Sequence, residues 1–166
     1  MSMIHVKAPE DYSAHLSADR TAVFLGGSIE MGKAERWQDE MADAMQGENV
    51  LLLNPRRKGW DASWEQTIDN AHFREQVEWE LKALENADLI LLYLQPDTKS
   101  PISLLEFGLY AKSAPEKLLV CCPDGFWRKG NVDITGARYG VRQVPDKAAM
   151  IEAVRVFVKT GQLDAA

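Results

Sequence analysis

Four short apolar runs, separated by segments long enough for a helix, constrain the fold of this chain more than any other feature. They occupy residues 21–27, 49–55, 88–94 and 117–122. Each run consists mostly of consecutive apolar side chains rather than an alternation of apolar and polar ones, which is typical of strands buried on both faces. Strands of that kind belong to parallel sheets that helices cover on each side.

Helical patterns fill the intervals between these runs, over residues 32–46, roughly 66–86, the segment around Glu106, and 146–161. Residues 140–144 are a candidate for a short fifth strand, and we expect a Gly-rich loop over residues 123–140. The sequence therefore predicts an α/β fold: a three-layer, doubly wound parallel sheet of about five strands, flavodoxin-like in arrangement. Residues 1–20 are polar and weakly patterned, and predict an N-terminal arm or a short edge strand. Residues 21–166 predict a single domain.

Composition excludes several classes of partner. The chain has 166 residues, 46% of them apolar, and a net charge of −6, so a basic face for nucleic acid or anionic membrane is not expected. No apolar run approaches the roughly 20 residues of a membrane span, and the N-terminus lacks the apolar core of a signal peptide. Cys121 and Cys122 are adjacent, which favours buried thiols in a reducing compartment. With three histidines and no metal-ligand spacing, we predict a cytoplasmic protein without metal or other cofactor.

The stretch "SPISLLEFGLYA" (100–111) carries one charge, Glu106, in an otherwise apolar or small run. Two interpretations are open. Ser103 and Glu106 have the S-x-x-E spacing of a capping box, in which the glutamate bonds a backbone N–H at a helix start. Alternatively, Glu106 is a catalytic carboxylate held in a pocket at a helix N-terminus.

A second carboxylate, Glu80, lies on the apolar side of the long predicted helix. At 100° per residue it falls beside Phe73, Val77 and Leu84, on the face expected to pack against the sheet. A buried carboxylate needs a partner or a raised pKa. It is either a structural hydrogen-bonding group or the second carboxylate of a cleft that also contains Glu106. Two such carboxylates are what glycosidic-bond chemistry requires.

Loops after the predicted strands should meet at one edge of the sheet, where ligands bind in folds of this kind. Gly27, Ser28 and Ile29 offer a hydroxyl and backbone N–H groups to phosphate or sugar oxygens, or form only a tight turn. Arg56, with Arg57 and Lys99, suits a phosphate or belongs to a solvated loop.

Aromatic residues are unusually frequent in two of these loops. Trp60 and Trp64 either stack on a nucleobase or pack on the flank of the domain or against a second subunit. Asn131 follows a similar segment, "GFWRKGNV", after the fourth run, and is a further candidate for ligand binding.

Three segments together resemble the nucleoside 2-deoxyribosyltransferase superfamily, including its 2′-deoxynucleoside 5′-phosphate N-hydrolase branch. They are "FLGGSI" (24–29), "EWELKALENADLILLYL" (78–94) and "SPISLLEFGLYA" (100–111). The resemblance spans about residues 21–122. It implies that Glu106 is the nucleophile and that Glu80 is the inward acid eight residues before Asp88. It also implies that a neighbouring subunit completes the site, hence a homodimer or higher homo-oligomer.

The departures from the family pattern bear on the substrate. Glu80 stands where the family usually has Asp, and Phe24 stands where many members have a Tyr hydroxyl near the nucleophile. Six residues before Glu106 the transferases tend to have Asp, whereas this chain has Ser100, as the nucleotide hydrolases do. In those hydrolases the serine contacts phosphate, which favours a phosphorylated substrate that is hydrolysed rather than transferred.

The resulting hypothesis is cleavage of the N-glycosidic bond of a nucleoside, deoxynucleoside or their 5′-monophosphates. Glu106 attacks C1′, Glu80 assists, and the sugar passes to water or to another base. Two alternatives remain on the same fold: an NAD-type glycohydrolase, and a noncatalytic nucleotide-binding sensor.

Overall fold

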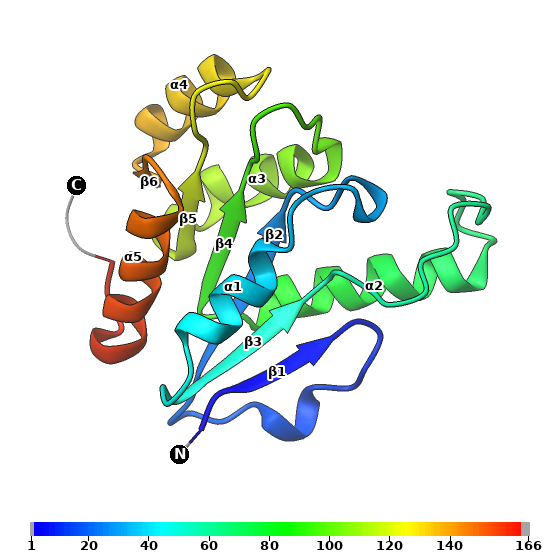
Figure 1. Cartoon of the computed structure of the whole chain (residues 1–166), viewed down its shortest axis with the longest axis horizontal. Coiled ribbons are helices and arrows are strands. Elements are labelled where there is room, and N and C mark those ends of the chain that lie inside the picture. The colour runs from blue at the N-terminus through cyan, green and yellow to red at the C-terminus, as the bar shows by residue number, and fades with distance from the viewer. Residues whose placement is uncertain (1, 164–166) are drawn as a thin grey trace.

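Six strands form one sheet in the computed structural model, which describes residues 2–163 apart from the side chain of Met31 (Figure 1). They are β1 (Ile4–Lys7), β2 (Thr21–Gly27), β3 (Val50–Asn54), β4 (Leu89–Tyr93), β5 (Leu118–Cys121) and β6 (Arg142–Val144). The order across the sheet is β1-β3-β2-β4-β5-β6, and each neighbouring pair is parallel. The fold is the predicted flavodoxin-like α/β arrangement, but the predicted count of about five strands was too low.

The additional strand, β1, comes from the segment predicted as an arm or edge strand. It pairs with β3 in the register Ile4↔Leu51 to Lys7↔Asn54. Beyond it, Tyr12 packs edge-to-face on Trp79, whose indole N–H donates to the Glu10 carbonyl at 2.8 Å. The N-terminal segment is therefore part of the sheet and its core. The predicted domain extends to residue 166, and residue 1 and residues 164–166 lie outside the described part.

Within residues 2–163, five α-helices cover the sheet in two layers: α1 (Trp37–Ala44), α2 (Ala71–Asn86), α3 (Pro101–Ser113), α4 (Lys129–Tyr139) and α5 (Lys147–Thr160). Trp37 and Met41 of α1 and Val154 of α5 share a core with one face of the strands. The opposite face packs against α2, α3 and α4. Figure 1 shows the sheet between the two helical layers. The central strands are fully buried on both faces, as their continuous apolar sequences predicted.

The prediction of a Gly-rich loop over residues 123–140 was wrong, because residues 129–139 form α4. The segment "KGNVDITGARY" has two glycines and three β-branched residues, all weak helix formers, so its sequence gives little helical signal. Tertiary contacts override that preference: Val132 is 1% exposed, and Gly136 lets the side chain of Gln143 approach the helix. Gly140, in the left-handed conformation, ends α4.

The strand order reverses between β2 and β4. From β2 the chain goes through α1 to β3 on one side; the next strand, β4, lies on the other side of β2. Ligands of doubly wound sheets bind at the carboxyl ends of the strands beside such a switch point. Short 3₁₀ helices also occur at Ser13–His15, Glu30–Gly32 and Pro115–Lys117. Across residues 2–163, no helix combines the length and apolar character needed to cross a membrane.

Candidate active site

The Gly-Gly-Ser loop lies directly at the switch point. Gly27 pairs with Tyr93 of β4 and has φ +126°, a conformation that favours glycine. A Cβ atom at this position would collide with the Tyr93 backbone. The Ser28 N–H continues the pairing, donating to the Tyr93 carbonyl at 2.8 Å. The glycine therefore serves the close approach of β2 and β4, and the Ser28 N–H is not free for a ligand.

Three hydroxyl groups meet behind this loop. The Ser28 Oγ lies 2.8 Å from Thr98 Oγ1 and 2.7 Å from Ser100 Oγ, and the latter two are 2.9 Å apart. The Gln95 N–H donates to Ser28 Oγ, and Thr98 Oγ1 donates to the Gln95 carbonyl. All three hydroxyl-bearing residues are buried. The cluster fixes the β4–α3 loop onto the end of β2, and brings together two predicted binding residues, Ser28 and Ser100.

The Glu30 carboxyl group occupies the backbone N–H groups at the start of α3. One Glu30 carboxylate oxygen, Oε1, accepts hydrogen bonds from the backbone N–H groups of Lys99 and Ser100, at 2.9 and 2.8 Å. Both Glu30 and Ser100 have a φ of 47°, the left-handed region that is uncommon for side chains other than glycine. Glu30 belongs to the 3₁₀ turn that follows Ile29, a partly buried residue whose carbonyl accepts from Gly32 and Ala34.

Glu106 lies in the interior of α3, and the capping-box interpretation of its sequence is wrong. The residue flanking the helix start is Ser100, Pro101 is its first residue, and Ser103 is already inside it. Glu106 is only 5% exposed. Burial, together with the nearby Glu80 carboxylate, raises the pKa of Glu106 to about 8.

Glu80, on α2, is held by a neighbour one helical turn earlier. Gln76 Nε2 donates to Glu80 Oε1 at 2.7 Å and to the Pro55 carbonyl at 2.9 Å. Burial raises the pKa of Glu80 to about 7, and the Gln76 hydrogen bond acts in the opposite direction. The two carboxyl groups thus form a pair that holds about one proton near neutral pH.

The Arg56 guanidinium donates hydrogen bonds to backbone carbonyls of the protein itself. Its Nη1 donates to the Glu35 carbonyl at 2.7 Å, and its Nη2 to the Gly32 and Ala34 carbonyls at 3.0 and 2.8 Å. The guanidinium therefore fixes the loop between β2 and α1 in the structure as it stands. Its predicted role with phosphate stays a prediction.

The two loop tryptophans pack mainly on their neighbours. The rings of Trp60 and Trp64 meet edge-to-face at 5.2 Å, Trp60 also contacts Phe73, and Trp64 stacks on His72 at 5.1 Å. The Arg57 guanidinium lies over Trp64. Figure 1 shows the loop between β3 and α2 extending toward the far end of α2, away from the centre of the sheet. The cluster is an aromatic anchor for that end of α2.

A third aromatic residue, Trp127, lies beside the start of α3. Its contacts with two cations were not predicted from the sequence. Trp127 is 47% exposed, and its indole N–H donates to the Lys99 carbonyl at 2.9 Å. Lys99 Nζ and the Arg128 guanidinium lie 4.4 and 4.3 Å from its ring centre. Asn131, two residues into α4's first turn, is exposed to solvent.

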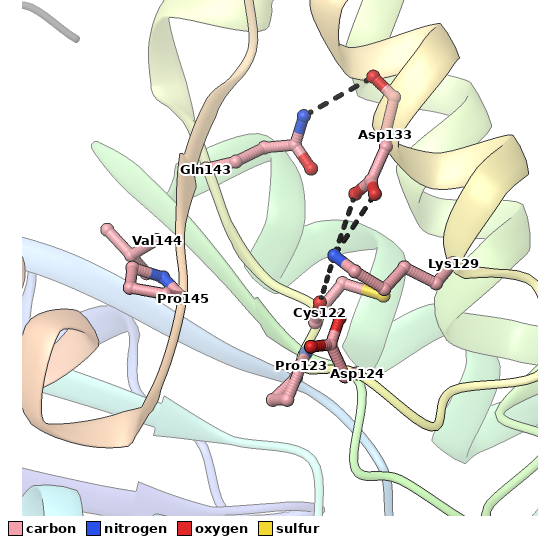
Figure 2. Close-up of a pocket in the computed structure, with 8 residues that line it drawn as sticks. All are labelled: Cys122, Pro123, Asp124, Lys129, Asp133, Gln143, Val144 and Pro145. Atoms are coloured by element: carbon pink, nitrogen blue, oxygen red, sulfur yellow. Dashed lines mark hydrogen bonds and ion pairs between the residues drawn. The ribbon is translucent and has the colours of Figure 1, made fainter.

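A cavity of about 370 Å³ opens at the carboxyl ends of β5 and β6, but the predicted site residues do not line it. Figure 2 shows the Lys129 amine pointing at its two acceptors, the Asp133 carboxylate at 3.0 Å and the Cys122 carbonyl at 2.9 Å. Its only cation is thus already paired among the described residues. No cluster of three or more His, Cys, Asp or Glu in residues 2–163 is arranged to hold a metal ion.

Three residues of the site were not predicted as functional: Gln76, Thr98 and Glu30. Gln76 lies four residues before Glu80, so the i, i+4 spacing of helical neighbours was an available signal. Thr98 precedes Ser100 in the same turn. Glu30 follows the Gly-Gly-Ser loop, and no sequence pattern links it to residues 99 and 100.

The protein is a flavodoxin-like α/β protein with two carboxyl groups of raised pKa, buried Glu106 and partly buried Glu80, on helices beside the switch point of its sheet. Such perturbed groups are typical of functional sites. The chain belongs to the nucleoside 2-deoxyribosyltransferase-like family, whose model matches residues 20–126. That range includes the hydroxyl cluster, Glu80 and Glu106, and ends before α4. A comparison with curated proteins finds no match.

Proposed function

We propose that this protein is an enzyme that cleaves the N-glycosidic bond of a nucleoside, a deoxynucleoside or their 5′-monophosphates, with Glu106 as the nucleophile. The observation that carries the proposal is the pair of buried Glu106 and partly buried Glu80, with pKa values near neutrality, in a chain of the deoxyribosyltransferase-like family. A nucleophile and a proton donor at one centre are the two groups that a retaining glycosidic mechanism needs.

The proposed reaction has two displacements. The ionised Glu106 carboxylate bonds to C1′ as the C1′–N bond breaks. The electrons of that bond go to the base nitrogen, which takes a proton from the Glu80 carboxyl group. Water or a second base then attacks C1′ and releases Glu106. When water attacks, the proton that it loses returns to Glu80, so the pair ends with the proton it began with.

The β4–α3 loop supports two forms of substrate. The Lys99 and Ser100 N–H groups at the start of α3, with the Lys99 and Arg128 side chains near Trp127, are donors and cations that would suit a 5′-phosphate. The Glu30 carboxylate now occupies those N–H groups. A phosphate must displace this carboxylate, whereas an unphosphorylated sugar need not.

The α3 surface supports assembly with a second copy of the chain. Ile102, Leu105 and Leu109 are 57, 60 and 48% exposed and share one face of the helix that carries Glu106. A homodimer through this face would cover them and bring a neighbouring chain close to the site. The free, buried Cys121 and Cys122 support a cytoplasmic, reducing location.

The experiment is a chromatographic screen for free base. Purified protein is incubated with each nucleoside, deoxynucleoside and 5′-monophosphate, and with NAD, with and without a second base. We expect base release from a nucleoside or nucleotide. Loss of at least about 1,000-fold in Glu106→Gln is expected, because a nucleophile is removed.

Glu78→Gln is the matched control, because Glu78 is an exposed acid two residues before Glu80 on the same helix. Its activity should equal that of the native chain. Full activity in Glu106→Gln would disprove the mechanism. Release of nicotinamide from NAD alone would favour the glycohydrolase alternative, and binding without any base release would favour the sensor.

A further inference from the structure

Gln76 makes the two carboxyl groups of the site unequal. Its side chain is buried, with 4% exposure, and its Nε2 bridges the Pro55 carbonyl and Glu80 Oε1 at 2.9 and 2.7 Å. Among the described residues, no hydrogen-bond donor reaches the Glu106 carboxyl group. One member of the pair therefore has a dedicated donor and the other has none.

The orientation of the Gln76 amide follows from its partners. The Pro55 carbonyl is an acceptor only, so a reversed amide would place Gln76 Oε1 against an acceptor. Gln76 Oε1 itself is buried and has no donor within the described part of the chain. The Gln76 amide nitrogen thus donates to Glu80 and to the Pro55 carbonyl, and the amide oxygen accepts no hydrogen bond from the described residues.

A hydrogen bond donated to a carboxylate stabilises the ionised form relative to the protonated form. The Gln76 donor therefore favours ionised Glu80. Glu106, buried in α3 without a donor and facing a neighbouring negative charge, is the better place for the shared proton. Ionisation of the pair then proceeds in order, first at Glu80 and then at Glu106.

We propose that Gln76 is a positioning residue that keeps Glu80 ionised in the unliganded protein and so places the pair's shared proton on Glu106. This inference deepens the proposed function and rests on it for its meaning in catalysis. The nucleophile is protonated at rest, and the proton must pass from Glu106 to Glu80 before the attack on C1′.

The test is a titration of the two carboxyl carbons by ¹³C NMR, in protein labelled at glutamate Cδ. Glu80→Gln and Glu106→Gln assign the two signals. In the native chain, the Glu80 carbon should titrate at lower pH than the Glu106 carbon. In Gln76→Met, which keeps the unbranched shape and removes the donor, the Glu80 titration should move to higher pH and the gap between the two should close or reverse.

Gln38→Met is the matched control, because Gln38 is a buried glutamine (1% exposed) on α1, which packs on the opposite face of the sheet. It should leave both titrations in place. Gln76→Asn, whose shorter side chain keeps an amide, guards against loss of folding in Gln76→Met and should give the same direction of change. Glu106 titrating first in the native chain, or an unchanged gap between the two titrations in both Gln76 variants, would overturn the proposal.

The titration needs no substrate, so it is decided independently of the base-release screen. Where the screen finds a substrate, Gln76→Met should raise kcat/KM by about 10-fold at a pH where the pair holds one proton, because the lost hydrogen bond no longer opposes transfer of that proton from Glu106 to Glu80. The acid limb of the pH profile should also move to higher pH. A merely structural role would lower the rate without moving that limb.

Discussion

Glu106 combines burial with the absence of a hydrogen-bond donor among the described residues, and that combination gives it a thermodynamic signature. Its pKa of about 8 and that of Glu80, about 7, both exceed the ordinary value of 4.5. These two carboxyl groups therefore bind more protons in the folded protein than in the unfolded chain between about pH 4.5 and pH 8. Their contribution to the free energy of unfolding falls as the pH rises through that window.

Glu106→Gln should remove most of this pH dependence, because glutamine has the same shape and does not ionise. We expect the variant to gain of order 2 kcal/mol in free energy of unfolding relative to the native chain at pH 8.5, and little at pH 4.5. Urea denaturation at the two pH values measures the difference. Glu78→Gln should show no such change, and an equal effect of Glu106→Gln at both pH values would contradict the burial of an ionisable group.

Sequence reasoning succeeded at the residues whose burial follows from their place on a helix. Glu80 was assigned to the inner face of α2 by helical geometry, and Glu106 was noticed because its neighbours are apolar. Other contacts of the site join segments that are distant in sequence or that lie in loops. The engagement of Arg56 by three carbonyls, and of Glu30 by the start of α3, could not be predicted from spacing.

Among the elements, the backbones of β2 and β4 approach each other closely at Gly27, where a side chain would collide with Tyr93. Gly27→Ala should destabilise the protein by about 3 kcal/mol or more, since a Cβ meets the Tyr93 carbonyl and the φ of +126° is strained for alanine. Chemical denaturation measures the loss.

Gly130→Ala is the matched control for that substitution. Gly130 lies in α4, and an added Cβ meets no atom within 4 Å. Because alanine is the better helix former, this variant should gain up to about 1 kcal/mol. Similar effects of the two substitutions would show that the close approach of β2 and β4 does not depend on Gly27.

The strands could be predicted because each is a continuous apolar run, and α5 because its Asp146 start, amphipathic pattern and Gly161 end agree with one another. α4 could not, because its weak helix formers are held by packing on α3 and β6 rather than by local preference. β1 is short and carries a mixture of apolar and charged side chains, so only its pairing with β3 defines it.

At the scale of the whole molecule, α3 presents an apolar face to solvent. We expect a homodimer in solution, because Ile102, Leu105 and Leu109 form a contiguous exposed stripe. Light scattering after size exclusion should give twice the chain mass, and Leu105→Lys should give the monomer. Ile68→Lys is the control, since Ile68 is 75% exposed in the loop before α2. A monomeric native chain would contradict the expectation.

The central claim is that Glu106 forms a covalent bond to C1′, and the configuration at that carbon tests it most directly. With the substrate found by the base-release screen and methanol as acceptor, NMR identifies the anomer of the methyl glycoside that is produced. Two displacements at C1′ predict retention of the substrate's β configuration, with no product from Glu106→Gln. An inverted α product would mean that the acceptor attacks directly and that Glu106 is not the nucleophile.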